Sequence, residues 1–503
     1  MPDNKLNKGD ESLPTIKLLC VKIISNKENK MKNQEFRIER DTVDTCQVPK
    51  DAYYGVHSIR AHENFPITGR QMDPEILKSI AQVKKACVIT NNEIGLMKDE
   101  KTNAIIQACD DIIDGKLHDQ FIVDAIQGGA GTSHNMSANE IIANRAIEIL
   151  GGELGDYSII HPNDHVNYGQ STNDVFPTSG KIATIRLLEN TKKSLIKLVE
   201  ALDKKSIEFD DYVKIGRTQM QDAIPIRLGQ EFNAYSKVII RDIKRFDQAI
   251  EAMSEVNLGA TAIGTGLNAD EDYVKKVVPN LSNVTGLDLR QAEDLVDGTQ
   301  NLDGFVFVSS IVKTSAVSLS KISNDLRLMS SGPRCGFNEI DLPPRQNGSS
   351  IMPGKVNPVI PEVVSQVAFN IIGNDTTITM AAEAGQLELN AFEPVIFFKL
   401  FESLRTLKGA VDTLVEHCID GIVGNKEQMK EVVDNSVGII TALVPHIGYT
   451  LAADIAKEAI KSGREVRELL LEQKIMDKET MEKILESTAM TTPGISAEEL
   501  IRN

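Results

Sequence analysis

The sequence predicts a mostly helical protein whose centre is a bundle of long helices. Apolar residues recur every three or four positions over several long stretches, which is the spacing of an α-helix that buries one face. The alternation typical of β-strands is weak throughout. The chain has 503 residues, of which 41% are apolar, so it is long enough for two or three packed domains with a large core.

Composition shifts along the chain predict four segments. Residues 1–30 are rich in Lys, Asn, Glu and Ser, and their one apolar run is interrupted by lysines, so we expect a disordered extension rather than a signal peptide. Residues 31–172 alternate short helices with loops and predict an N-terminal helical domain. Residues 173–425 predict the helix-bundle domain, and residues 426–503 a small C-terminal helical domain.

The bundle prediction rests on five long periodic stretches. They lie at about 178–209, 226–253 and 302–329, in the helix that follows Pro358, and near 400–418. A shorter helix is expected over residues 74–92. Five long helices in one segment are typical of a bundle, and we expect the faces of these helices to form an oligomer seam as well.

Charge and cysteine content restrict the class of protein. The net charge of −17 argues against nucleic acid or an anionic membrane as a partner, although a local field can still favour an anionic substrate. No stretch reaches the apolar length of a membrane span. The six cysteines form no CxxC pair and show no metal-ligand spacing, which predicts reduced thiols in a cytoplasmic protein.

The stretch 348–358 predicts an ordered loop that binds an anion. Its two glycines and two prolines exclude a regular element, and a long apolar helix follows it. Backbone N–H groups near Lys355 suit an anion, and Ser349 and Ser350 add two hydroxyls. This combination suits chemistry in which a proton leaves while negative charge builds on a carboxylate. A flexible linker is the alternative, but linkers seldom place Lys, Asn and two prolines beside a buried helix.

Three more polar loops carry side chains suited to a ligand: the loop around Thr132, Ser171-Thr172-Asn173, and residues 216–222. Hydroxyls, amides, an Arg and a Lys with few acids fit a small dicarboxylate. His161 and His165 match neither a zinc motif nor a triad, so each is either a hydrogen-bonding residue or a base.

Two further features leave their roles open. Glu362 is either a first-turn acid favoured by the helix dipole or a residue that tunes the site. Gly259, Gly264 and Gly266 do not follow the dinucleotide-binding order, so we expect a tight turn between bundle helices instead of a nucleotide site.

The loop 348–357 matches the pattern GSSxMPxKxN and resembles the signature loop of the fumarase/aspartase superfamily. The resemblance extends from about Arg37 to the C-terminus. Residues 373–387 and 216–219 resemble aspartases rather than fumarases, and residues 51–57 are also similar to aspartases. Within 216–219, Gln219 stands where fumarases carry His and many bacterial aspartases carry Gln. The resemblance implies three helical domains around a five-helix bundle, which assembles into a homotetramer whose active sites are shared between subunits.

The resemblance also implies an ammonia-lyase that reversibly converts L-aspartate to fumarate and ammonia. Ser349 matches the catalytic base, and Lys355 with Asn357 would hold an aci-carboxylate intermediate. The other positions that match substrate-binding or supporting residues are Thr132, Ser171, Thr172, Asn173, Thr218, Gln219, Ser350 and Glu362. No organic cofactor is expected, magnesium activates some relatives, and the sequence shows no metal site. The alternatives are a fumarate hydratase and a non-catalytic helical scaffold of the same fold.

Overall fold

The computed structural model describes residues 35–502, so the predicted extension 1–30 lies outside the described residues. The chain separates into two compact units. Unit 1 contains the residues up to Gly180 together with Val256–Gln300 and Gln386–Pro394, and unit 2 contains Lys181–Glu255, Asn301–Gly385 and Val395–Asn503. The division into domains at residues 172 and 425 stays a prediction.

Unit 1 is a set of short helices with small strand pairs. The antiparallel strands β1 (Phe36–Arg40) and β2 (Thr45–Pro49) pair Phe36 with Pro49, and β5 (Glu255–Val256) pairs with β6 (Arg290–Gln291). The helical elements are α2 (Val56–Asn64), α3 (Pro74–Glu93), α4 (Asp99–Ile113), η1 (His118–Gln120), α5 (Thr132–Ile149), η2 (Pro162–Val166), α8 (Glu271–Thr285) and α9 (Leu295–Gln300).

Helix α3 occupies the centre of unit 1 and packs against α4, α5 and α8. It begins where the sequence predicts, because Pro74 fits a first turn and the Asp73 carboxylate accepts the backbone N–H of Glu75 at 2.8 Å. Its buried face is apolar apart from a few polar side chains, among them Lys84, which has no exposed surface.

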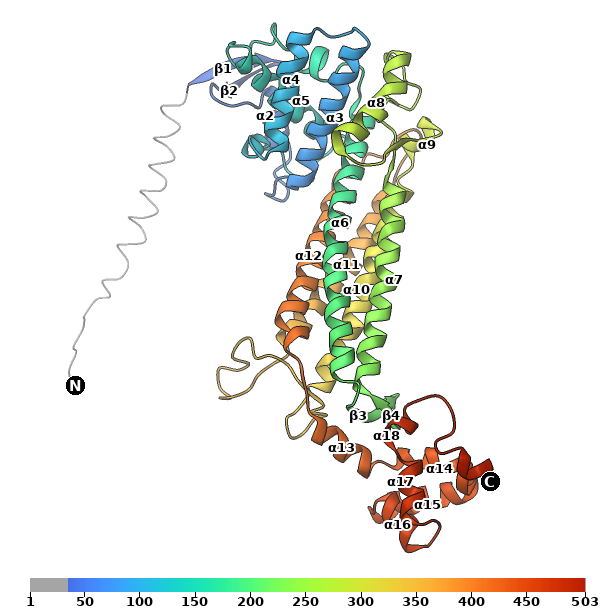
Figure 1. Ribbon diagram of the computed structural model, residues 1–503. Helices are drawn as coiled ribbons and strands as arrows, with labels where there is room; N and C mark the ends of the chain where they lie inside the picture. Colours follow the sequence, from blue (N-terminus) through green and yellow to red (C-terminus); the bar gives the residue numbers. More distant parts are fainter. Residues whose placement is uncertain (1–34, 503) are drawn as a thin grey trace, which may run out of the picture. The chain divides into compact units, whose positions relative to one another are not determined.

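Unit 2 contains the predicted bundle, and Figure 1 shows its long helices running beside one another. The mostly helical fold with a central five-helix bundle is therefore confirmed. The five helices are α6 (Thr172–Glu208, whose first turns belong to unit 1), α7 (Leu228–Met253), α10 (Asp303–Met329), α11 (Val359–Glu383) and α12 (Glu393–His417).

Polar side chains join neighbouring bundle helices across an apolar core. The Asp375 carboxylate of α11 accepts the Ser309 hydroxyl of α10 at 2.8 Å and pairs with Lys313 at 2.6 Å. The Tyr235 hydroxyl of α7 donates to Asp325 of α10 at 2.9 Å. Since each bond needs its partner at the same level, these contacts fix how far each helix is shifted along the next.

Helix α10 departs from one prediction. By length and composition alone it is apolar enough to cross a membrane, although no stretch was expected to be; half of its most apolar window is buried within this chain. It packs along α7 and α11 as a core helix. Part of its apolar character therefore reflects burial against these two helices, while Phe307 and Val317 stay exposed in the single chain.

Short strands were the elements that sequence periodicity missed. The antiparallel hairpin of β3 (Val213–Thr218) and β4 (Gln221–Arg227) replaces the predicted start of a helix at Ile226, and α7 begins at Leu228. Strand β7 (Ile340–Asp341) pairs with β8 (Val423–Gly424). The glycine turn expected between bundle helices instead precedes α8 in unit 1, with positive φ at Gly259, Gly264 and Gly266.

The C-terminal part of unit 2 forms a second apolar core. Ile215 of β3 packs with buried side chains of several short helices, including Leu443 and Leu469. The helical elements that follow the bundle are η3 (Ile419–Gly421), α13 (Lys426–Asn435), η4 (Val437–Ile439), α14 (Ile440–Ile447), α15 (Tyr449–Ser462), α16 (Val466–Glu472), α17 (Lys478–Ile484), α18 (Ser487–Met490) and α19 (Glu499–Arg502).

Candidate active site

The predicted anion loop lies between β7 and α11 in unit 2, and it has no regular secondary structure. Its two ends are joined: the Gly348 N–H donates to the carbonyl of Lys355 at 2.8 Å, and the Asn357 amide donates to the carbonyl of Gly348 at 2.9 Å. A Cβ at position 348 would lie 2.5 Å from the Lys355 carbonyl oxygen, so only glycine fits there. The loop is thus an ordered turn rather than a linker.

The Ser349 hydroxyl oxygen accepts two backbone N–H groups of its own loop. They come from Ile351 at 3.2 Å and Met352 at 3.1 Å. Donors aimed at an oxygen stabilise its negative charge, which lowers the cost of forming an alkoxide. The local backbone therefore supplies part of the stabilisation that a serine base needs.

The other predicted residues of this loop are held less tightly. Ser350 and Lys355 are exposed, and Asn357 is half-buried with one amide N–H already used by Gly348. Glu362 lies in the first turn of α11, the position at which the helix dipole favours an acid. The structure thus agrees with the first-turn interpretation of Glu362, whereas its role in tuning the site stays a prediction.

Thr218 and Gln219 lie at the tip of the β3–β4 hairpin, and both are exposed. Thr218 pairs with Gln221, and the two residues between them, Gln219 and Met220, have positive φ of 54° and 64°. Positive φ at both central positions is the two-residue hairpin turn that suits the twist of the strands. The predicted polar loop is therefore a rigid turn, and non-glycine residues bear its strain.

A buried carboxylate holds this hairpin against the strand that leads to the Ser349 loop. Glu339, immediately before β7, is 1% exposed and pairs with Arg217 and Lys214 of β3, each at 2.6 Å. The Arg217 guanidinium also stacks over the Phe337 ring at 4.0 Å. Because Arg217 precedes Thr218, this cluster fixes the hairpin tip relative to β7.

Thr132 lies in unit 1, as the first residue of α5, and it is exposed. The preceding turn takes positive φ at Gly129, Ala130 and Gly131. A Cβ at position 131 would meet the Phe176 ring at 2.2 Å, so the small-residue sequence lets the loop approach α6 closely. The loop predicted around Thr132 is therefore a tight turn into a helix N-terminus.

Ser171 directly precedes α6 and Thr172 and Asn173 begin it; these three residues, called the Ser171 group below, lie where a buried acid organises the backbone. The carboxylate of Asp174, fully buried, accepts backbone N–H groups from Ser171 at 2.9 Å and from Gly259 and Thr261 at 3.1 Å each. Burial raises the pKa of Asp174 to about 6, against the lowering effect of those N–H groups and of Lys84.

The structure brings the start of α6 together with the first turn of α5. The Asn135 amide donates to the Thr172 hydroxyl oxygen at 3.1 Å, and the Asn173 amide donates to the carbonyl of Ala262 at 2.7 Å. Asn135 lies one turn beyond Thr132 on the same helix. Unit 1 therefore contains Thr132 and the Ser171 group on neighbouring elements, whereas Thr218, Gln219 and the Ser349 loop belong to unit 2.

His161 and His165 both act as hydrogen-bonding residues at η2. The His161 ring caps this short helix by accepting the backbone N–H groups of Asn163 and Asp164. The His165 ring accepts the His161 N–H at 2.7 Å and contacts Lys101 at 2.8 Å. Burial and then Lys101 lower the pKa of His165, which disfavours the charged form of the ring.

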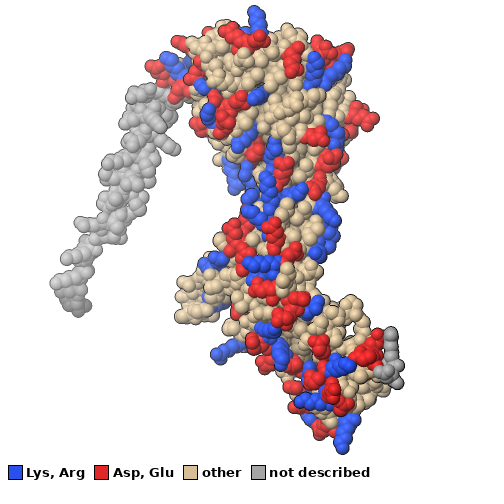
Figure 2. All heavy atoms as spheres, in the orientation of Figure 1, with Lys and Arg blue, Asp and Glu red and all other residues tan. Residues whose placement is uncertain are grey.

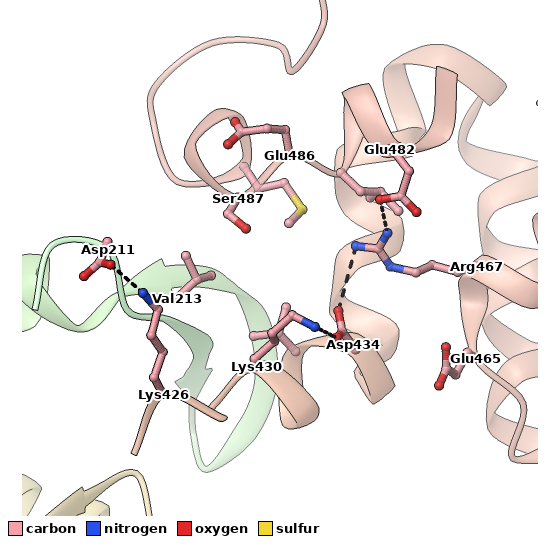
Figure 3. Close-up of a pocket in the computed structure, with 13 residues that line it drawn as sticks. Asp211, Val213, Lys426, Lys430, Asp434, Glu465, Arg467, Glu482, Glu486 and Ser487 are labelled. Carbon is pink, nitrogen blue, oxygen red and sulfur yellow. Dashed lines mark hydrogen bonds and ion pairs between the residues drawn. The ribbon is translucent and has the colours of Figure 1, made fainter. Parts of the chain in front are cut away.

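Two cavities in unit 2 differ in whether predicted site residues line their walls. A cavity of about 550 Å³ beside the β3–β4 hairpin includes Thr218 and Arg217 in its wall. A larger cavity of about 680 Å³, shown in Figure 3, contains none of the predicted site residues. Its charges pair with one another, since Arg467 bonds to Glu482 at 2.7 Å and Lys430 to Asp434 at 3.1 Å.

Metal ligands are not clustered in residues 35–502: no group of three or more His, Cys, Asp or Glu side chains there could hold an ion. The cysteines of the same range are free thiols. Of these, Cys87 and Cys109 are fully buried, and burial raises the pKa of the Cys87 thiol to about 12.

Sequence analysis missed four residues that support the candidate site: Lys84, Asn135, Asp174 and Glu339. Lys84 carried a detectable signal, since it interrupts the apolar face formed by Leu77, Ile80 and Val88. A lysine at such a position is either at the surface or holds a buried polar group. Glu339 and Asn135 gave no such signal because their partners are distant in the sequence.

Comparisons with known proteins match nearly the whole described chain. The lyase family matches residues 44–373, and the fumarase C C-terminus family matches residues 439–492. An aspartate ammonia-lyase of Bacillus subtilis (strain 168) is 51% identical over 468 residues, covering 93% of this chain and 98% of the relative. An aspartate ammonia-lyase of Helicobacter pylori (strain 26695) is 50% identical over 459 residues, covering 91% and 98%.

Solved structures agree with these relatives. A fumarate lyase:delta crystallin from Brucella melitensis superimposes with a TM-score of 0.89 at 47% identity, covering 91% of this chain and 100% of the other. A class II fumarase from Schistosoma mansoni gives a TM-score of 0.88 at 33% identity, with the same coverage. The family match, the extent of the shared sequence and the shared fold together place this chain in the lyase family, as a member of the fumarase/aspartase superfamily.

Proposed function

We propose that the chain catalyses the reversible deamination of L-aspartate to fumarate and ammonia. Relatives about 50% identical over more than nine-tenths of this chain are aspartate ammonia-lyases. Gln219 and the segment 376–386 favour aspartate over malate as the substrate, as the resemblance implies. Such a carbon–nitrogen lyase acts on a small dicarboxylate.

The observation that carries the proposed mechanism is the pair of backbone N–H groups on the Ser349 oxygen. In the proposed reaction Ser349 removes a proton from the carbon beside the side-chain carboxylate of aspartate. The electron pair passes into that carboxylate and forms an aci-carboxylate, and the carbon–nitrogen bond then breaks to release ammonia and leave fumarate. Positive charge at Lys355 and the second N–H of Asn357 favour the charged intermediate.

The remaining predicted residues bind the carboxylates. Hydroxyl and amide donors of Thr132, the Ser171 group, Thr218 and Gln219 suit carboxylate oxygens, which accept hydrogen bonds only. Ser350 and Glu362 support the loop. Because Gln219 does not titrate, we expect no histidine relay at that position. The reaction requires no organic cofactor, and a divalent cation such as magnesium is proposed only as an activator, as in some relatives.

We propose that the active protein is a homotetramer joined through the bundle. Large apolar side chains on two bundle helices are exposed in the single chain, and they include Phe307 and Val317 of α10, 45% and 51% exposed, and Phe369 and Met380 of α11, 64% and 66% exposed. Apolar patches of this kind favour burial against another chain. Light scattering after gel filtration measures the mass directly.

Acidic and basic side chains lie intermixed over most of the face drawn in Figure 2. With the net charge of −17, this supports a cytoplasmic enzyme of small molecules that binds neither nucleic acid nor membrane.

The decisive experiment measures fumarate by its ultraviolet absorbance, with L-aspartate in one cuvette and L-malate in another. We expect a signal from aspartate. A signal from malate alone would make the protein a fumarate hydratase, and no signal from either would favour the scaffold alternative or another amino acid as the substrate.

A further inference from the structure

Lys84 is a fully buried cation whose position has no role in the reaction proposed above. Its ammonium donates to two side-chain amide oxygens, Asn167 Oδ1 at 2.7 Å and Gln170 Oε1 at 2.9 Å. Burying an ammonium costs several kcal/mol after relaxation. This cost is a large part of the free energy of unfolding of a typical domain, about 5–15 kcal/mol, so a domain can carry few such sites. A charge placed there at such cost points to a function for it.

The same amide oxygen of Asn167 collects further donors. Asn135 and Asn139 of α5 each donate an amide N–H to Asn167 Oδ1 at 3.2 Å. The other N–H of Asn135 donates to the Thr172 hydroxyl oxygen at 3.1 Å. A continuous chain of hydrogen bonds therefore runs from Lys84 through Asn167 and Asn135 to Thr172, entirely within unit 1.

The direction of this chain is set at its charged end. An ammonium has donors and no acceptor, so Asn167 turns its oxygen toward Lys84. Asn135 must then present its amide nitrogen to that oxygen, and the same nitrogen faces Thr172. Since the Thr172 oxygen accepts from Asn135, its own O–H proton is left to donate elsewhere. A carboxylate, which only accepts, is the matching partner.

We propose that Lys84 is a positioning residue for the dicarboxylate, which acts through Asn167 and Asn135 to keep the Thr172 hydroxyl oriented as a donor. This inference rests on the proposed function, and it adds a buried cation that does not touch the substrate. Asn167 is also held by a bond from its amide to the Gln170 carbonyl at 3.2 Å, so Lys84 and Gln170 orient it together.

The surroundings of Lys84 give a second consequence. Burial lowers the pKa of Lys84 to about 8, and the groups that interact with it are Asp174 of α6, Cys87 of α3 and Cys109 of α4. Tyr273 of α8 lies in the same cluster, because it interacts with both Cys87 and Asp174. Above about pH 8 the neutral amine can accept as well as donate, so Lys84 no longer forces the orientation of Asn167, which then depends on the Gln170 carbonyl alone.

The experiment uses succinate as a probe, because it has two carboxylates but no amine and does not react. Its dissociation constant is measured by calorimetry from pH 7 to pH 9.5, alongside kcat and KM for L-aspartate. We expect Lys84→Met to weaken succinate about tenfold at pH 7 and to raise KM similarly, with kcat changed less than about threefold. Wild-type binding should weaken above pH 8 more than that of the variant.

Lys85→Met is the matched control. Lys85 is the next residue of α3, but its ammonium pairs with Asp110 at 2.7 Å and is partly exposed. We expect this variant to bind succinate as the wild type does. Wild-type affinity in Lys84→Met, or equal losses in both lysine variants, would overturn the proposal.

Asn167 supplies a second test if Lys84→Met folds poorly by circular dichroism. Asn167→Asp keeps an acceptor oxygen for Lys84 and Asn135, whereas Asn167→Leu removes it, so only the leucine variant should lose affinity about tenfold. Equal affinity in these two variants would contradict the relay. A wild type that binds succinate but does not act on aspartate would refute the proposed function alone, since the binding test does not need turnover.

Discussion

The Ser171 group of unit 1 and the Ser349 loop of unit 2 carry similar side chains, but the structure holds them in opposite ways. Thr172 is 8% exposed and Asp174 is fully buried, and both bond to elements far away in the sequence. In the Ser349 loop, Ile351 is 84% exposed, and the bonds at Ser349 and Gly348 stay within the loop.

This difference separates two kinds of substitution effect. A change in the Ser171 group disturbs packed neighbours, so it should affect stability and binding together. A change in the Ser349 loop disturbs an exposed segment with few neighbours, so it should affect chemistry with little effect on stability. The donors of the first region are held in place before substrate arrives, which reduces the entropy lost on binding.

The largest expected effect is the loss of turnover in Ser349→Ala. Removing a general base costs about 10²–10⁴-fold in rate, and the two N–H groups on the serine oxygen would lose the charge they stabilise. The free energy of unfolding should change by less than about 0.5 kcal/mol, because the loop is exposed. Fumarate absorbance and thermal unfolding measure the two quantities. Ser350→Ala, its exposed neighbour, is the control and should retain much more activity; equal losses would remove Ser349 as the base.

The next largest effect is on the pH dependence of stability in Asp174→Asn. Burial raises the pKa of this carboxyl from its ordinary value of 3.8 to about 6 in the folded protein. The folded state therefore binds the proton more tightly than the unfolded state, and this group makes stability fall as pH rises from about 4 to 6. The shift corresponds to about 3 kcal/mol.

The measurement compares urea unfolding of both proteins between pH 4 and pH 7. The variant should lack this contribution, so the difference in unfolding free energy between wild type and variant should shrink as pH rises. Near pH 4 the variant should be less stable than the wild type, because an amide has one acceptor oxygen to offer the three N–H groups of Ser171, Gly259 and Thr261. A difference that is independent of pH would show that Asp174 titrates normally.

The same contrast explains how much the sequence could predict. The long helices follow from apolar periodicity, which burial in a bundle imposes along the whole element, and the Ser349 loop follows from local glycines and prolines. The β3–β4 hairpin was missed because its tip is polar and its strands are short. The Lys84 relay was missed because Lys84 bonds to Asn167 and Gln170, which lie more than eighty positions away in the sequence. Local chemistry can be inferred from sequence, whereas partners supplied by tertiary packing cannot.

The smallest effect concerns the hairpin tip, where function and backbone strain coincide. Gln219 and Met220 both hold positive φ, which costs a non-glycine residue about 1 kcal/mol, so glycine at either position should stabilise the protein by up to that amount. Gln219→Gly should also lower kcat/KM for aspartate about tenfold by removing a side chain proposed to bind substrate. Met220→Gly should gain the stability without this loss, because Met220 has no proposed contact with substrate. For both variants, unfolding in urea measures the change in stability, and initial rates measure kcat/KM for aspartate. If both glycine variants lost the same activity, the rigidity of the turn would matter and the Gln219 side chain would not.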